Sequence, residues 1–200
     1  MTIKPFILAA LTALLWSCAD SPSVQFYVLE PLPAPTQTNL EINNRQVIGI
    51  GPISLPSILE NKKIVTRLSD NTVQIAQFQQ WASPLQDNIL LTLTRNLTAL
   101  QPNTIIRAYP WSVHGQVDQQ IIIDIVRFDT TPGLSANLEA NWTIKNEKTN
   151  AVLQNGRSVI NQPLTDPSYP ATVHALSKIL GSFSQELLLA LLKSSIKIIR

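Results

Sequence analysis

Hydrophobic and polar residues alternate with a period of two between positions 134 and 145. The apolar set is Leu134, Ala136, Leu138, Ala140, Trp142 and Ile144, and polar side chains occupy most of the positions between them. Successive side chains of a strand point to opposite faces of a sheet, so the pattern predicts one buried face and one solvated face, as in an antiparallel sheet. We therefore expect Leu138 to be buried and Asn141 to be exposed.

Shorter apolar runs predict further strands. These runs cover residues 26–29, 47–52, 62–68, 72–76, 104–109, 120–128 and 152–160. Asp70-Asn71 suits the turn of a hairpin, because both residues tolerate positive φ. Gly49 and Gly51 resemble the start of a phosphate-binding loop, but the third glycine is missing and Pro52 follows. A buried structural strand is therefore favoured for 47–52.

Two longer segments have the three- to four-residue apolar spacing of amphipathic helices. The first covers 84–100, where Ser83 is the predicted N-cap, Pro84 occupies the first helical position and Gln86 completes a capping box. The second covers 171–192 and fits either packing on the same sheet or a short coiled-coil seam. Together the patterns predict an α+β fold, a mixed or antiparallel sheet with two main helices packed on one face.

The first eighteen residues have the layout of a bacterial lipoprotein signal. Lys4 supplies a positive charge, 6–16 is apolar, and the chain's single cysteine, Cys18, stands at the expected cut. The apolar run is far shorter than the roughly 20 residues of a membrane-spanning helix. We predict a signal peptide over 1–17, a lipidated tether with a short strand and a proline-rich linker over 18–46, and the α+β domain over 47–200. The alternative is an ordinary secretory signal with a chance cysteine.

Composition narrows the function classes. The chain has 15 Lys and Arg against 13 Asp and Glu, and charged residues make up 14% of it, against about 25% in a typical domain. Such a balance offers no basic field for nucleic acid. Once Cys18 carries lipid, no cysteine remains for a disulfide or for thiolate chemistry.

Candidate catalytic and metal-binding groups are sparse. His114 and His174 have no second ligand at metal spacing. Asp124 and Asp129 flank a predicted strand five residues apart, so we expect their side chains on opposite faces. No serine stands in a Gly-x-Ser-x-Gly motif. The sequence therefore predicts no catalytic residue, no metal site and no cofactor.

A series of short motifs, in order, resembles a known family. The motifs are Phe26-Tyr27-Val28-Leu29, Gly51-Pro52-Ile53-Ser54-Leu55-Pro56, Ile64-Val65-Thr66-Arg67, Trp81-Ala82-Ser83-Pro84-Leu85, Tyr109-Pro110-Trp111, Ile123-Asp124-Ile125-Val126-Arg127-Phe128-Asp129 and Leu138-Glu139-Ala140-Asn141-Trp142. In this order, ahead of a C-terminal helix, they resemble the ABC-type transport auxiliary lipoproteins. Each motif alone is weak, and the resemblance covers nearly the whole mature chain.

The resemblance implies a periplasm-facing lipoprotein that works with an MCE-domain transport protein and an inner-membrane component. Such systems are thought to move lipid between the two membranes. Ala19 rather than aspartate follows Cys18, which favours the outer membrane in bacterial sorting. Two functions stay open. One is a non-enzymatic anchor and docking ring, which allows a homo-oligomer. The other is a lipid carrier with its own apolar cavity of roughly 300–1,000 Å³.

Overall fold

The computed structural model describes residues 22–33, 46–112 and 115–198. Within these ranges the strands are β1 (Gln25–Tyr27), β2 (Val47–Ser54), β3 (Lys63–Ser69), β4 (Thr72–Trp81), β5 (Ile105–Ala108), β6 (Gln119–Thr131), β7 (Ser135–Asn146) and β8 (Val152–Pro163). The α-helices are α2 (Leu85–Leu100) and α3 (Tyr169–Ile198), and a short 3₁₀ turn, η2 (Ser57–Glu60), precedes β3. The predicted α+β class is confirmed.

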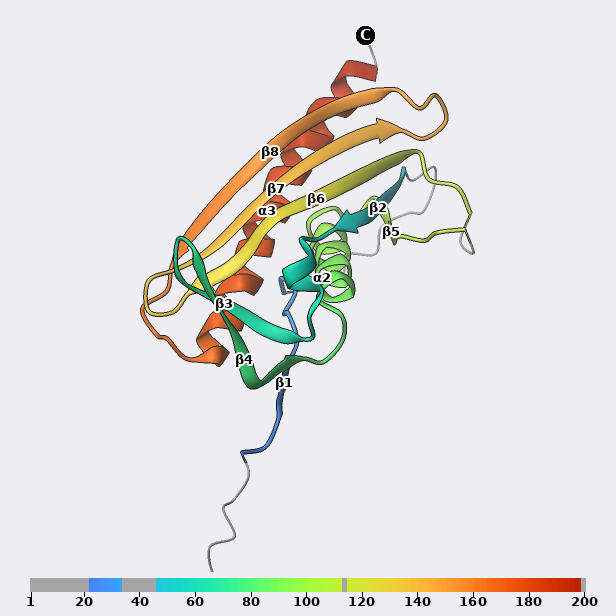
Figure 1. Cartoon of the computed structure of the whole chain (residues 1–200). Coiled ribbons are helices and arrows are strands. Elements are labelled where there is room, and N and C mark those ends of the chain that lie inside the picture. Colours follow the sequence, from blue (N-terminus) through green and yellow to red (C-terminus); the bar gives the residue numbers. More distant parts are fainter. Residues whose placement is uncertain (1–21, 34–45, 113–114, 199–200) are drawn as a thin grey trace, which may run out of the picture.

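The long strand β6 organises the sheet (Figure 1). On one side it pairs antiparallel with β7, which in turn pairs antiparallel with β8. On its other side lie two strands in succession, β2 along its first half and β3 at Thr130. β5 extends the sheet beyond β2 in parallel, β4 pairs antiparallel with β3, and β1 pairs parallel with β4. The sheet is therefore mixed, as predicted.

Both helices cover the same face of this sheet. Figure 1 shows α3 running along the back of β6, β7 and β8, and α2 packs on α3, β2 and β5. The stretch Tyr169–Ser194 is long and apolar enough to cross a membrane, but 61% of its apolar window is buried in the domain. α3 thus has the burial of a core helix, and packing on the sheet replaces the coiled-coil alternative.

The predicted alternation is confirmed within β7, but it is wrong for Leu134, which is 67% exposed and lies in the turn before the strand. Leu138 is 1% exposed and lies opposite Phe128 of β6 and Ile160 of β8, whereas Asn141 is exposed. The apolar run 47–52 is confirmed as a strand with consecutive buried residues, because β2 lies between two other strands and beneath α2. Gly49 has a structural role, since a Cβ added there would lie 2.7 Å from the Trp111 ring.

The predicted capping box of α2 is wrong. Pro84 occupies the N-cap position and no side chain caps the helix. Gln86 instead turns to the sheet, where its Nε2 donates to the Ile53 carbonyl at 2.6 Å. The Ser83 hydroxyl accepts a hydrogen bond from Asn88 Nδ2 at 2.9 Å. A long-range bond to β2 has therefore replaced the local one that the sequence pattern favours.

The expected opposite orientation of Asp124 and Asp129 is also wrong. The register between β6 and β7 shifts between Ile125 and Arg127, so β6 contains one extra residue, a β-bulge. Asp124 pairs with Asn141 and Asp129 with Asn137, and these asparagines lie four residues apart on β7 and share a face. Both carboxylates consequently lie on the face of the sheet that the helices leave uncovered.

The chain beyond β1 is docked rather than loose over its described part. Leu29 is buried, and the Glu30 N–H donates to Ser177 Oγ of α3 at 3.0 Å. The Leu32 N–H donates to Asn96 Oδ1 of α2 at 2.6 Å. Leu32 also contacts Gly181, where an added Cβ would lie 3.0 Å from its Cδ2. The segment expected to be a linker therefore begins as a strap across both helices.

Candidate functional site

The residue with the strongest predicted role, Cys18, lies outside the described residues, and so does His114. Lipidation of Cys18 stays a prediction. His174 lies exposed on α3. Within the described ranges no group of three or more His, Cys, Asp and Glu side chains is placed to hold a metal ion.

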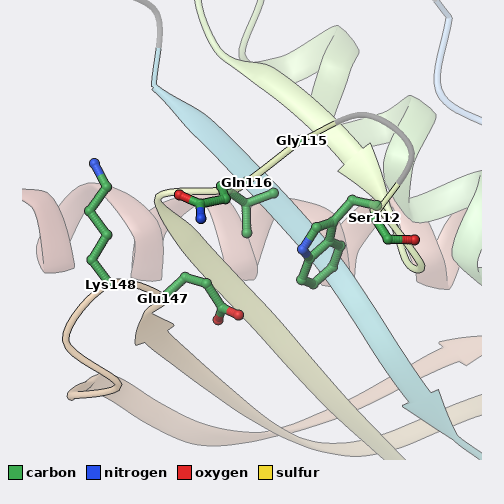
Figure 2. Close-up of a pocket in the computed structure, with 7 residues that line it drawn as sticks. Ser112, Gly115, Gln116, Glu147 and Lys148 are labelled. Atoms are coloured by element: carbon green, nitrogen blue, oxygen red, sulfur yellow. The ribbon is translucent and has the colours of Figure 1, made fainter.

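A pocket of about 600 Å³ opens at one end of the sheet (Figure 2). Its lining residues are Trp111, Ser112, Gly115, Gln116, Val117, Glu147 and Lys148. Glu147 and Lys148 come from the turn after β7, and the others come from the segment between β5 and β6. The Trp111 ring is fixed by its contact with β2 at Gly49 and by an edge-to-face contact with Tyr109, with centroids 5.4 Å apart.

Charged groups organise the β7–β8 turn beside this pocket. Asp118 Oδ2 accepts the Val47 N–H at 2.9 Å, and Lys148 Nζ lies 3.1 Å from Asp118 Oδ1. The Val47 hydrogen bond is the largest influence and holds the pKa of the Asp118 carboxyl below its usual range. Burial opposes it, and the hydrogen bond and charge of Lys148 lower the pKa further. Glu147 Oε2 lies 3.3 Å from Lys145 Nζ. The lining of this pocket is about half polar, with Glu147 and Lys148 among its residues, which suits hydrogen-bonded ligands better than acyl chains.

The part of the core beneath Trp81, between the sheet and the helices, is nearly filled. The cavity bounded by Trp81, Leu85, Phe128 and Leu176 has a volume of about 10 Å³. That is no more than the space of a single water molecule. This part of the core has no room for a lipid chain.

The uncovered face of the sheet holds a charged cluster around Asp129. Arg67 Nε lies 3.0 Å from Asp129 Oδ2, and Arg127 Nε lies 2.9 Å from Oδ1. Asn137 Nδ2 donates to the same carboxylate at 3.4 Å. The Asp129 side chain is only 6% exposed, while both guanidinium groups reach solvent. The cluster is fully paired and carries a net positive charge, so it suits a structural or docking role better than proton transfer.

Apolar side chains surround this cluster on the same side of the domain. Val65, Val73 and Val126 line a shallow hollow of about 60 Å³ with Arg67 and Asp129. Ile58, Val73, Ile75 and Val126 are exposed. Sequence reasoning missed the cluster because Arg67 and Asp129 lie 62 residues apart. The spacing Arg127-x-Asp129 was the one available signal, since residues i and i+2 of a strand share a face.

Comparison with known proteins identifies the family. The family described as the ABC-type transport auxiliary lipoprotein component matches residues 27–187. The chain belongs to this family. The resemblance found in the motifs is thereby confirmed, and the family is named for an auxiliary transport component, not for an enzyme class.

Curated relatives and solved structures agree with this membership. The chain is 22% identical over 122 residues to the intermembrane transport lipoprotein PqiC of Escherichia coli strain K12, and the match covers 61% of this chain and 63% of PqiC. The crystal structure of protein XCC0632 from Xanthomonas campestris has a TM-score of 0.71 at 17% identity, covering 88% of this chain and 100% of that one. A crystal structure of an uncharacterised protein has a TM-score of 0.69 at 17% identity, covering 83% and 97%. These structures support the fold alone.

Proposed function

We propose that the protein is a non-enzymatic lipoprotein of an MCE-type intermembrane lipid transport system, and that it docks the transport complex at the outer membrane. The observation that carries the proposal is the family match over residues 27–187. PqiC, to which the chain is similar, is named an intermembrane transport lipoprotein. The partners in this proposal are an MCE-domain protein and an inner-membrane component.

The nearly filled core beneath Trp81 supports docking over lipid carriage. A carrier needs an apolar cavity of roughly 300–1,000 Å³. The space beneath Phe128 and Trp81 holds only about 10 Å³. The pocket beside Trp111 has the volume, about 600 Å³, but Glu147, Lys148 and Gln116 line it. Desolvating these groups against an acyl chain would be unfavourable. A docking component instead needs an exposed surface, and the sheet face around Arg67 and Asp129 offers one.

Acyl chains on Cys18 are the proposed anchor. Each buried methylene contributes about 0.8 kcal/mol, so two or three chains hold a protein stably in a bilayer. Only four peptide steps separate Cys18 from Pro22, the first described residue. They reach about 14 Å at most. The domain is therefore held close to the membrane, and Ala19 favours the outer one.

Affinity isolation of the tagged, membrane-extracted protein tests the proposal. We expect an MCE-domain protein and an inner-membrane protein to copurify, and the N-terminal peptide to begin at an acylated Cys18. Cys18→Ala removes the proposed acceptor thiol in the same isolation. Ser17→Ala is its matched control, because it changes the neighbouring residue and keeps the thiol. Two results together would contradict docking and favour the carrier. One is that no transport protein copurifies; the other is that the domain without its covalent acyl chains still holds one bound lipid per molecule.

A further inference from the structure

Three outward-facing residues at the start of the described chain are apolar. Val24, Phe26 and Val28 are 43%, 66% and 55% exposed. They alternate with Tyr27 and Leu29, which pack toward the core. We call Val24, Phe26 and Val28 the β1 stripe. The outward face of an edge strand is ordinarily polar, so an apolar face here calls for an explanation.

The stripe is held rigidly. β1 pairs in parallel with β4, with Phe26 opposite Gln80 and Tyr27 opposite the buried Trp81. Burial, together with the nearby Tyr169, raises the pKa of the Tyr27 phenol, as expected for a side chain turned toward the core. Leu29 and the strap that follows it fix the other end to α2 and α3. The stripe is therefore a fixed surface of the domain, with a defined direction.

The segment that carries the stripe and the far end of the domain differ in charge. No charged residue occurs between Pro22 and Val28. The opposite end, at the β7–β8 turn, carries Asp118, Lys145, Glu147 and Lys148. Figure 1 shows β1 at the lower end of the domain and this turn at the upper end. The stripe itself is uncharged, and Lys63 lies two strands away, opposite Gln80, which in turn lies opposite Phe26. An uncharged apolar segment with a cationic residue nearby is the pattern expected of a surface that rests on a bilayer.

The position of the stripe along the chain indicates that a lipid bilayer covers it. This inference rests on the proposed anchoring at Cys18. Six peptide steps separate Cys18 from Val24. Their full extension is about 21 Å, so the stripe stays beside the bilayer that holds the acyl chains. We propose that the β1 stripe seats in the headgroup region of this bilayer and so fixes the orientation of the domain. Retention belongs to the acyl chains, and orientation belongs to the stripe.

The test uses the full-length lipidated protein with Phe26→Cys. The chain has a single natural cysteine, so once Cys18 is acylated the new thiol is the only free one and accepts an environment-sensitive fluorophore. The protein is reconstituted into vesicles of phosphatidylethanolamine and phosphatidylglycerol with brominated acyl chains. Val152→Cys is the control, because Val152 is 60% exposed and begins β8 at the charged end.

We expect brominated lipid to quench the label at position 26 at least about twofold, since apolar interfacial residues lie at the headgroup–acyl boundary, and to leave the label at position 152 unchanged. Replacing Val24, Phe26 and Val28 together by Ser should leave the protein in the membrane fraction. In this triple variant the label is attached through Gln25→Cys or through Val152→Cys. We expect the two labels to be quenched to the same extent.

Three outcomes would overturn the proposal, and they are distinguishable. Equal quenching at positions 26 and 152 in protein with acylated Cys18 would overturn the seating of the stripe alone. So would an unquenched but blue-shifted label at position 26, which would indicate that a second copy or another protein covers the stripe. Labelling of the unsubstituted protein at Cys18 would show a free thiol and overturn the anchor together with the stripe.

Discussion

Truncating Leu138 is the sharpest perturbation of the core that supports this account. Leu138 is 1% exposed and lies in the middle strand of the β6–β7–β8 sheet, opposite Phe128 and Ile160. Leu138→Ala removes three carbon atoms. At about 0.8 kcal/mol each, their lost transfer free energy is roughly 2.4 kcal/mol. Paired strands on both sides restrict collapse around the site, so a cavity contribution adds to this loss. We expect a total of about 3–4 kcal/mol.

Such a loss is large against the free energy of unfolding of about 5–15 kcal/mol typical of a domain. Urea unfolding of the domain from Ser21, followed by circular dichroism, measures it as a lower midpoint at an unchanged slope. Asn141→Ala is the matched control three residues along the same strand. Asn141 is exposed and makes one weak hydrogen bond, to Asp124 at 3.3 Å. The Asn141→Ala protein should lose less than about 0.5 kcal/mol of its free energy of unfolding. Equal losses in the two variants would refute the assigned faces of β7.

The remaining predictions concern buried charge, pH, close packing and metal. Asp129→Asn should lower the free energy of unfolding by about 1–3 kcal/mol, because Arg67 and Arg127 lose the carboxylate that pairs with them. A melting temperature equal to that of the unsubstituted protein would contradict this. Asp118→Asn should destabilise by less than about 1 kcal/mol at pH 7 because the side chain is 40% exposed. The lowered pKa means that this contribution is present above about pH 4, the ordinary pKa of an aspartate, and is lost as the pH falls through the folded-state pKa, so urea midpoints of the two proteins should converge at still lower pH. Gly156→Ala places a Cβ against the Trp142 ring and should lower the free energy of unfolding by about 1–3 kcal/mol, with a changed near-ultraviolet tryptophan signal; an unaltered signal would argue against the contact. A chelator should leave the melting temperature unchanged, and a fall of several degrees would reveal a metal site.

The parts of the fold that the sequence predicted are those governed by local periodicity. The alternation around Leu138 indicates a strand with one buried face and one solvated face. The apolar spacing of 84–100 indicates a helix with one buried face. Each signal is contained within a dozen or so residues. For this reason the elements and the sheet-on-helix class were predictable before any partner was known.

The errors lie where a distant partner overrides a local preference. Gln86 bonds to Ile53, 33 residues away, instead of capping its own helix. The bulge near Val126 reverses the face of Asp129, yet no glycine or proline marks it in the sequence. The salt bridge from Arg67 to Asp129 depends on β3 lying beside β6, which only the tertiary fold establishes. The proposed lipid site is the reverse case, because the prediction of Cys18 rests on sequence pattern alone.

The central claim, that the protein works as a lipid-anchored docking component, is tested most directly through Cys18→Ala. This change removes the proposed acceptor thiol and alters none of the residues of the described core. The measurement is complementation of an envelope barrier defect, with fractionation and partner pull-down on the same cells and Ser17→Ala as the control.

We predict that the Cys18→Ala protein leaves the membrane fraction, stays folded, still binds its MCE-domain partner and fails to restore the barrier, while Ser17→Ala restores it. The physical reason is that the complex then lacks its outer attachment although its docking surface is intact. Full restoration of the barrier by Cys18→Ala protein that is demonstrably soluble would contradict the docking account.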